Sequence, residues 1–129
     1  MISDDCKYTQ EHEWVKVEDI ESGEALIGIT DYAQDQLGDI VYLELPQSGA
    51  VVKQLDKMGE VESVKAVSDL FSPISGNVIE SNTELNDHPE LVNEDPFGKG
   101  WLIRVTITSV NELEGLMSAS GYQSYINGL

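Results

Sequence analysis

The stretch Gly59-Glu60-Val61-Glu62-Ser63-Val64-Lys65-Ala66-Val67-Ser68-Asp69 decides how this chain folds. Val61 and Ser63 alternate with glutamates, which predicts a short strand. Residues 66–69, followed by a turn at Ser72-Pro73, are typical of the partner strand. The two strands would form a tight hairpin, and Lys65 would lie at its tip.

Lys65 is unusual in its setting. The chain has only seven Lys and Arg residues against 24 Asp and Glu, and the neighbours of this lysine are Val64 and Ala66. A cation in such a place indicates an amine presented for modification. A lysine that blunts a sheet edge against aggregation has the same position, and the spacing alone leaves both interpretations open.

The composition fits one domain. The chain has 129 residues, 40% of them apolar, which is enough for a hydrophobic core. We expect a single domain over residues 1–129, with residues 1–7 as a flexible N-terminal tail.

The charge limits the partners. A net charge of -17 disfavours nucleic acid and anionic membranes, which attract clustered Lys and Arg. It favours a monomer and protein partners with basic docking surfaces. No secretory signal and no membrane-spanning run is recognisable, so we expect a soluble intracellular protein.

Few residues suggest chemistry of the chain's own. Cys6 is the only cysteine, which excludes an intrachain disulfide, a Cys-x-x-Cys pair and a cysteine-rich zinc site. His12 has no Ser or Cys partner at a spacing that indicates a hydrolase. The acidic surroundings of His88 fit neither an EF-hand nor a zinc pair. We therefore predict no metal site and no enzyme activity.

The first half of the chain is predicted to be mainly strand. Residues 13–17 and 25–29 alternate as two strands around a polar, glycine-containing turn. Thr30-Asp31 is expected to cap a short helix over 32–37, with Gln34 at capping-box spacing and Gly38 as its end. Residues 40–45 are expected to form another strand, which ends at Pro46.

A weak internal repeat relates two segments. Pro46-Gln47-Ser48-Gly49-Ala50-Val51-Val52 matches Pro73-Ile74-Ser75-Gly76-Asn77-Val78-Ile79 at Pro, Ser, Gly and Val. Two strand-turn-strand units can pack as a small sandwich. A chance match among common turn residues is the alternative.

The C-terminal part is predicted to be loop, strand and helix. Residues 82–100 are interrupted by prolines and glycines, and 101–107 alternate as a strand. Ser109 and Glu112 form a capping-box pattern before an apolar stripe of Leu113, Leu116 and Met117. Gly121 is expected to break this helix before a last segment over 122–126.

In these residues the chain resembles the H proteins of the glycine cleavage system, a family of lipoyl-carrying shuttles. The resemblance covers nearly the whole chain, and its motifs are Tyr8-Thr9, His12-Glu13-Trp14-Val15, Gly28-Ile29-Thr30-Asp31-Tyr32-Ala33-Gln34, Leu37-Gly38-Asp39-Ile40-Val41, Glu44-Leu45-Pro46, Val61 to Asp69, Pro73-Ile74-Ser75-Gly76, Pro89-Glu90-Leu91-Val92-Asn93 and Gly100-Trp101-Leu102. It implies a mainly β fold: a lipoyl-domain-like small β-sandwich (hammerhead or barrel-sandwich hybrid) with a short early helix and a C-terminal helix.

The resemblance implies that lipoic acid is attached covalently to Lys65 by an amide bond. A lipoate ligase or lipoyltransferase would recognise the hairpin through Glu62, Ser63, Val64 and Ala66.

The lipoyl arm would accept an aminomethyl group from glycine decarboxylase (P protein) and deliver it to the aminomethyltransferase (T protein). Dihydrolipoamide dehydrogenase (L protein) would then reoxidise it. By resemblance, Glu13 and Asp69 match the acidic positions of a cleft that shelters the loaded arm.

Other functions compete with this one. Biotinyl domains and the lipoyl domains of acyltransferases share the hairpin lysine, but the first typically flank it with methionines and the second are shorter tethered modules. A lipoyl relay to other enzymes is a further alternative, and an acidic interaction module would explain only the charge. The lack of a transit segment favours a bacterial cytoplasm over a mitochondrial matrix.

Overall fold

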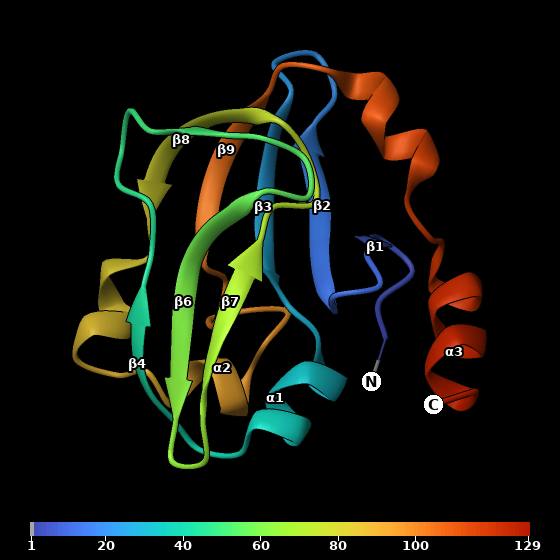
Figure 1. The fold of residues 1–129 in the computed structure, drawn as a ribbon. Helices are drawn as coiled ribbons and strands as arrows, with labels where there is room; N and C mark the ends of the chain where they lie inside the picture. The colour runs from blue at the N-terminus through green and yellow to red at the C-terminus, as the bar shows by residue number, and fades with distance from the viewer. Residues whose placement is uncertain (1) are drawn as a thin grey trace.

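Two antiparallel sheets build the molecule (Figure 1). The computed structural model describes residues 2–129. The six-stranded sheet has the order β1-β2-β3-β9-β8-β5, and the three-stranded sheet has the order β4-β6-β7. The strands are β1 Lys7–Tyr8, β2 Glu13–Asp19, β3 Glu24–Ile29, β4 Ile40–Glu44, β5 Val51–Val52, β6 Lys57–Ser63, β7 Val67–Phe71, β8 Gly76–Ser81 and β9 Ile103–Ile107. The mainly β fold expected from the sequence is confirmed.

The N-terminal hairpin forms as its alternation predicts. β2 and β3 pair from Glu13↔Ile29 to Asp19↔Glu24. Gly23 has φ +79° in the intervening turn, a left-handed conformation that costs glycine little. β3 pairs on its other edge with β9, so this hairpin lies inside the larger sheet.

The core fills the space that the two sheets enclose. One cluster gathers side chains mainly from the six-stranded sheet, including Ile27 and Val105, together with Ile74 from the segment before β8. A second joins the three-stranded sheet, through Val61 and Leu70, to Leu102 and Val92. Burial alternates along β9 and along the first part of β8, as expected where one face of a sheet meets water. The first three residues of β2 and the last three of β3 are all buried.

The early helix, α1 Asp31–Leu37, has the predicted limits within one residue. The Thr30 side chain accepts a hydrogen bond from Ala33 N, and the amide of Gly38 donates to Gln34 O. The capping box is not completed, because the Gln34 side chain donates to Asp31 Oδ1 at 3.0 Å. The backbone N–H of Thr30 is bonded instead to His12 O.

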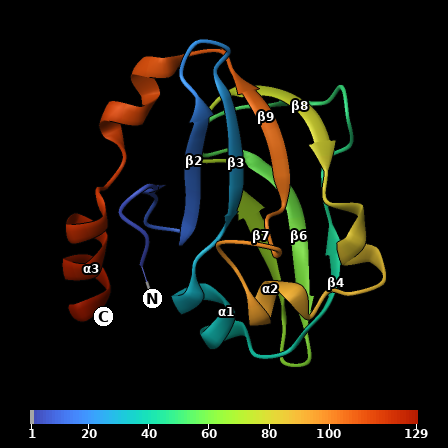
Figure 2. The same cartoon turned by 180° about the vertical axis from the view of Figure 1, so that it is seen from behind.

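The C-terminal helix begins later than the sequence predicts. Residues 110–115 form a 3-10 helix, η2 Val110–Gly115, and Ser109 makes no side-chain cap. The carboxylate of Glu112 bonds Ser75 rather than the helix start. The true helix, α3 Ala119–Asn127, is capped by Ser118 and passes through Gly121 without a break. Figure 2 shows α3 beside the N-terminal segment.

The segment expected to be loop contains helical turns. Residues 82–100 include η1 Thr83–Asn86 and α2 Leu91–Glu94. Val92 is fully buried. Each of these helical turns is four residues long.

The flexible tail expected over residues 1–7 extends too far, because Cys6 and Lys7 belong to the folded structure. Cys6 is buried beside Tyr8, Trp14 and Tyr122, and Lys7 pairs with Val15 in β1. Burial raises the pKa of the Cys6 thiol, which makes it a poor nucleophile. No helix among residues 2–129 is long and apolar enough to cross a membrane.

The repeated segments lie against each other. β5 pairs antiparallel with β8, Val51 opposite Asn77 and Val52 opposite Gly76. The bond from Val78 N to Ala50 O continues this ladder. The two copies are therefore partners in one sheet, and they do not form the two separate halves that the repeat suggested.

Candidate functional site

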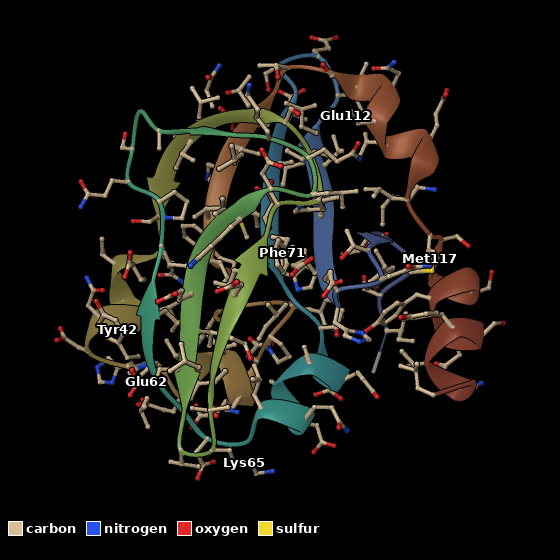
Figure 3. All side chains as sticks on the ribbon, viewed as in Figure 1. Tyr42, Glu62, Lys65, Phe71, Glu112 and Met117 are labelled. Atoms are coloured by element: carbon tan, nitrogen blue, oxygen red, sulfur yellow. The ribbon has the colours of Figure 1, made fainter. Side chains whose placement is uncertain are left out.

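Lys65 lies at the tip of the β6–β7 hairpin, as the alternation predicted (Figure 3). The turn is fixed from within by Ser63, whose Oγ accepts hydrogen bonds from Lys65 N at 3.1 Å and Ala66 N at 3.2 Å. Ser63 N also donates to Ala66 O. Ser63 is buried, whereas Val64, Lys65 and Ala66 are exposed. The hairpin therefore presents an amine on a turn of defined shape.

The chain around α1 supports the same turn from outside. Val64 N donates to Asp39 O at 3.0 Å. A Cβ on Gly38 would lie 3.2 Å from Lys65 Cε, so the glycine leaves room for the lysine stem. Gly38 also has φ +81°, which a larger residue adopts only with strain.

Asn93 is a supporting residue that sequence reasoning missed. Its Nδ2 donates to Gln34 Oε1 and to Gly38 O, both at 2.9 Å, and its Oδ1 accepts from Ile40 N. The side chain thereby joins the end of α1 to the start of β4. The only signal in the sequence was its place in the Pro89–Asn93 motif.

Glu13 lies at the start of β2 and is almost completely buried, with 2% of its surface exposed. Thr9 Oγ1 donates to Glu13 Oε1 at 2.7 Å, and Phe71 N donates to Oε2 at 3.3 Å. Thr9 Oγ1 also accepts from Glu13 N. Both donors are neutral, and no ion pair involving Glu13 occurs among residues 2–129.

Burial without a cationic partner raises the pKa of Glu13 to about 8, and the bonds from Thr9 and Phe71 oppose the rise only in part. Desolvation penalises the charged form of a carboxyl group. At neutral pH the neutral acid therefore predominates in the free protein.

We expect this carboxyl to make the fold less stable as pH rises. Its pKa is higher in the folded chain than the ordinary 4.5, so its contribution is complete below pH 4.5 and is lost as pH rises toward about 8. Within that window the free energy of unfolding should fall by up to about 1.4 kcal/mol per pH unit. Urea unfolding of Glu13→Gln beside the parent chain at several pH values measures the difference.

Thr9→Val and Thr9→Ser provide the matched control for Glu13. The valine removes the hydroxyl at nearly constant volume and should raise the pKa of Glu13 further, whereas serine keeps the donor. Carbon NMR titration of the Glu13 carboxyl reads this directly. An unchanged pKa in Thr9→Val would contradict the role given to the hydroxyl.

A groove of about 410 Å³ opens beside Glu13. Thr9 and Phe71, the two donors to its carboxyl, belong to the lining, so the acid lies directly behind the groove wall. Tyr8, Thr9, Gln10, Glu11, Gln54, Leu55, Phe71, Gly115, Leu116 and Met117 line the groove. β7 runs from the hairpin tip to Phe71, so the groove lies at the far end of this strand from Lys65 (Figure 3).

Glu112 anchors the segment that forms one side of the groove, residues 115–117. Its carboxylate accepts from Ser75 N at 2.7 Å and Ser75 Oγ at 2.9 Å, and its carbonyl accepts from Gln54 Nε2. Met117 exchanges two backbone bonds with Tyr8. These contacts hold residues 115–117 against the body of the protein.

Asp69 lies on the exposed face of β7, where its carboxylate is 3.2 Å from Lys57 Nζ. About half of its side-chain surface is accessible. Glu62 also faces solvent. The structure thus places Glu13 on β2 and Asp69 on β7, in different sheets and different environments. Asp69 is outside the groove lining.

The site can present one amine and provide a half-enclosed groove with a neutral acid behind its wall. Nowhere in the described part of the chain do three or more His, Cys, Asp or Glu side chains gather as metal ligands would.

Comparison with known proteins agrees with this arrangement. A family model described as "Glycine cleavage H-protein" matches residues 6–128. A protein of Marinobacter nauticus named "Glycine cleavage system H protein" is 50% identical over 125 residues, 97% of this chain and 95% of its own length. A Geobacillus kaustophilus protein of the same name is 53% identical over 124 residues, 95% of this chain and 94% of its own. The crystal structure of a glycine cleavage system H protein from Mycobacterium marinum is similar, with a TM-score of 0.89, 42% identity and coverage of 99% of this chain and 100% of that one.

Proposed function

The chain belongs to the glycine cleavage H-protein family, and from this premise we propose that it is a lipoyl-carrying shuttle of the glycine cleavage system with lipoic acid on Lys65. The observation that supports the attachment point is the exposed amine on a turn held by Ser63. A rigid, protruding turn can enter an enzyme's active site with little loss of conformational entropy.

The residues fit the group. Lys65 provides a primary amine, and Gly38 leaves space along its stem. Amide formation joins Nζ to the acyl carbon of an activated lipoate; the amine loses a proton and the activating group leaves with its electron pair. When bound, lipoate supplies a dithiol–disulfide pair, chemistry that the buried Cys6 does not provide.

The proposed partners are those of the glycine cleavage system. Glycine decarboxylase would load the arm with an aminomethyl group, the tetrahydrofolate-dependent aminomethyltransferase would remove it, and dihydrolipoamide dehydrogenase would reoxidise the dithiol. The chain itself would catalyse none of these steps. Its like-sign charge supports a monomer, and the bacterial sources of its relatives support a bacterial cytoplasm.

Glu13 is the residue that we propose to meet the cationic amine of the loaded arm. Entry of an ammonium group beside the groove would favour loss of the carboxyl proton, because an opposite charge within about 4–6 Å lowers the pKa of an acid. Thr9 and Phe71 N would keep the two carboxyl oxygens in place. Asp69, exposed on β7, is proposed as a second carboxylate along the path of the arm.

Peptide mass spectrometry tests the attachment. The chain is produced in a host supplied with lipoate, and the segment Gly59–Phe71 is analysed. We expect one lipoyl group on Lys65, and the purified protein should then support glycine-dependent NAD reduction with the three partner enzymes. Biotin at Lys65 would indicate carboxylase chemistry instead, and an unmodified lysine beside an active ligase would contradict the proposal.

A further inference from the structure

Exposed apolar side chains gather around the Lys65 hairpin. Val41, Tyr42, Val64 and Val67 are 48%, 57%, 66% and 59% exposed; we call these four the apolar collar. The other large apolar side chains that are exposed among residues 2–129 lie on the six-stranded sheet, in turns, in η2 or at the C-terminus, and they are Ile20, Val51, Leu55, Ile79, Val110 and Leu129. Apolar clusters on a highly charged surface commonly mark interaction sites.

The strand register places two of the collar side chains, Tyr42 and Val67, on either side of Glu62. Tyr42 pairs with Glu62 across β4 and β6, and Glu62 pairs with Val67 across β6 and β7. Residues opposite each other in antiparallel strands point to the same face. The three side chains therefore form one row across the outer face of the sheet, and Figure 3 shows Tyr42 and Glu62 on neighbouring strands above Lys65.

A second row on the same face is acidic, and we call Glu44, Glu60 and Asp69 the acidic row; it lies two residues farther from Lys65 along each strand. Glu44 pairs with Glu60, which pairs with Asp69. Lys57 Nζ contacts Glu60 at 2.8 Å and Asp69 at 3.2 Å. With Glu62 included, the face carries four carboxylates against one lysine, so its charge remains negative.

We infer that the apolar collar and the acidic row form the docking surface for the enzyme that acylates Lys65, and that this enzyme meets them with apolar side chains rimmed by Lys and Arg. The inference rests on the proposed function and adds Val41, Tyr42, Val67 and the acidic row to the recognition of the hairpin.

The position of the apolar collar beside Lys65 indicates which of the proposed partners binds it, namely the acylating enzyme. That enzyme must bring its active site to Nζ itself, so its contact surface lies within a few residues of the turn. Enzymes that react with the distal end of a long arm can work without touching the strands beside Lys65. Charge complementarity also favours a basic rim, because like charges would oppose docking.

Val67→Thr and Val51→Thr give a matched pair of variants. Both change an exposed strand valine in the same way, but Val51 lies on the other sheet. Purified unmodified proteins are offered to a lipoate ligase with lipoate and ATP. We expect kcat/KM to fall about 10-fold for Tyr42→Ser and about 3-fold for Val67→Thr, mainly through KM, as partial loss of an interface contact would do. Val51→Thr should remain within 2-fold of the parent, a change of only about 0.4 kcal/mol.

Three results would overturn the docking surface. Acylation of the collar variants as fast as the parent chain would contradict a role for the apolar collar. A KM for the parent chain that does not rise with salt would contradict the basic rim of the enzyme. Lipoylated variants are also offered to dihydrolipoamide dehydrogenase. An equal fall in kcat/KM with that enzyme would contradict the assignment of this surface to the acylating enzyme. Thermal unfolding of each variant separates lost contact from lost fold. Failure of the parent chain itself to be lipoylated would refute the proposed function instead, so the two failures differ.

Discussion

Lys65→Arg should abolish lipoylation and, with it, glycine-dependent NAD reduction in the presence of the three partner enzymes. A guanidinium stays protonated at any relevant pH, since its pKa exceeds about 12, so it cannot form the amide. Lys65 is exposed at a turn, and no ion pair of its ammonium is present within residues 2–129. The free energy of unfolding should therefore change by less than about 0.5 kcal/mol.

Lys53→Arg serves as the control for this substitution. Lys53 is exposed between β5 and β6, away from the hairpin tip, and its replacement should leave both lipoylation and transfer intact. Intact-mass measurement and the coupled NAD assay are made on both variants. Transfer activity in Lys65→Arg at the parent rate would show that the chain works through charge alone, as an acidic interaction module would.

Trp14→Ala should cost about 3–5 kcal/mol of folding free energy, the range for a buried aromatic residue replaced by alanine. Trp14 has no exposed surface, its Nε1 donates to Ile29 O at 2.9 Å and Pro96 O at 3.2 Å, and its ring stacks on Phe97 at 5.7 Å. The loss would be a large part of a typical total of about 5–15 kcal/mol.

The backbone opposite Trp14 leaves no alternative to this packing. A Cβ on Gly28 would lie 2.5 Å from the indole ring, so the ring fills the space above a bare backbone. Alanine would leave a cavity there. Because Trp14 follows Glu13 in β2, loosening this strand should also disturb the carboxyl behind the groove.

Trp101→Ala is the comparison within the same chain. Trp101 is only partly buried and lies 5.8 Å from Arg104 in a cation–π contact, an interaction of about 0.5–1 kcal/mol when exposed. Urea unfolding should show a clearly smaller loss for Trp101→Ala than for Trp14→Ala. Equal losses of unfolding free energy in the two variants would contradict the argument that burial makes Trp14 the more important residue for stability.

Local patterns were sufficient for much of the fold. The alternation before and after Lys65, the turn at Gly23 and the Thr30–Gly38 limits of α1 each depend on residues close in sequence, and each is confirmed. They could be predicted because hairpins and helix caps satisfy their hydrogen bonds within a few residues.

Long-range contacts account for the errors. Ser109 and Glu112 have capping-box spacing, but Glu112 is bonded to Ser75 from a distant turn, so the helix starts only after Ser118. Cys6 falls within the expected tail of residues 1–7, yet it is buried in a cluster that includes Tyr122 of α3. Both contacts join residues far apart in the sequence, so patterns of neighbouring residues could not predict them.

The candidate site divides in the same way. The tip position of Lys65 follows from alternation, and the significance of that lysine follows from the resemblance. The burial of Glu13 could not be predicted, because a glutamate at the end of a strand is ordinarily solvated. Its environment depends on Phe71 N, which comes from a different sheet. Thr9 and Asn93 were present in the quoted motifs, but nothing in the sequence showed what they hold.

The β3–β9 pairing has a consequence for biosynthesis. These strands meet in the middle of the six-stranded sheet, although Ile29 and Ile103 are separated by most of the chain. At about 5–20 residues per second, a ribosome needs roughly 4–15 s to add β9 after β3. During that interval the nascent N-terminal hairpin has an unpaired edge, so a polypeptide that stalls before Ile103 would expose it to aggregation or to chaperones.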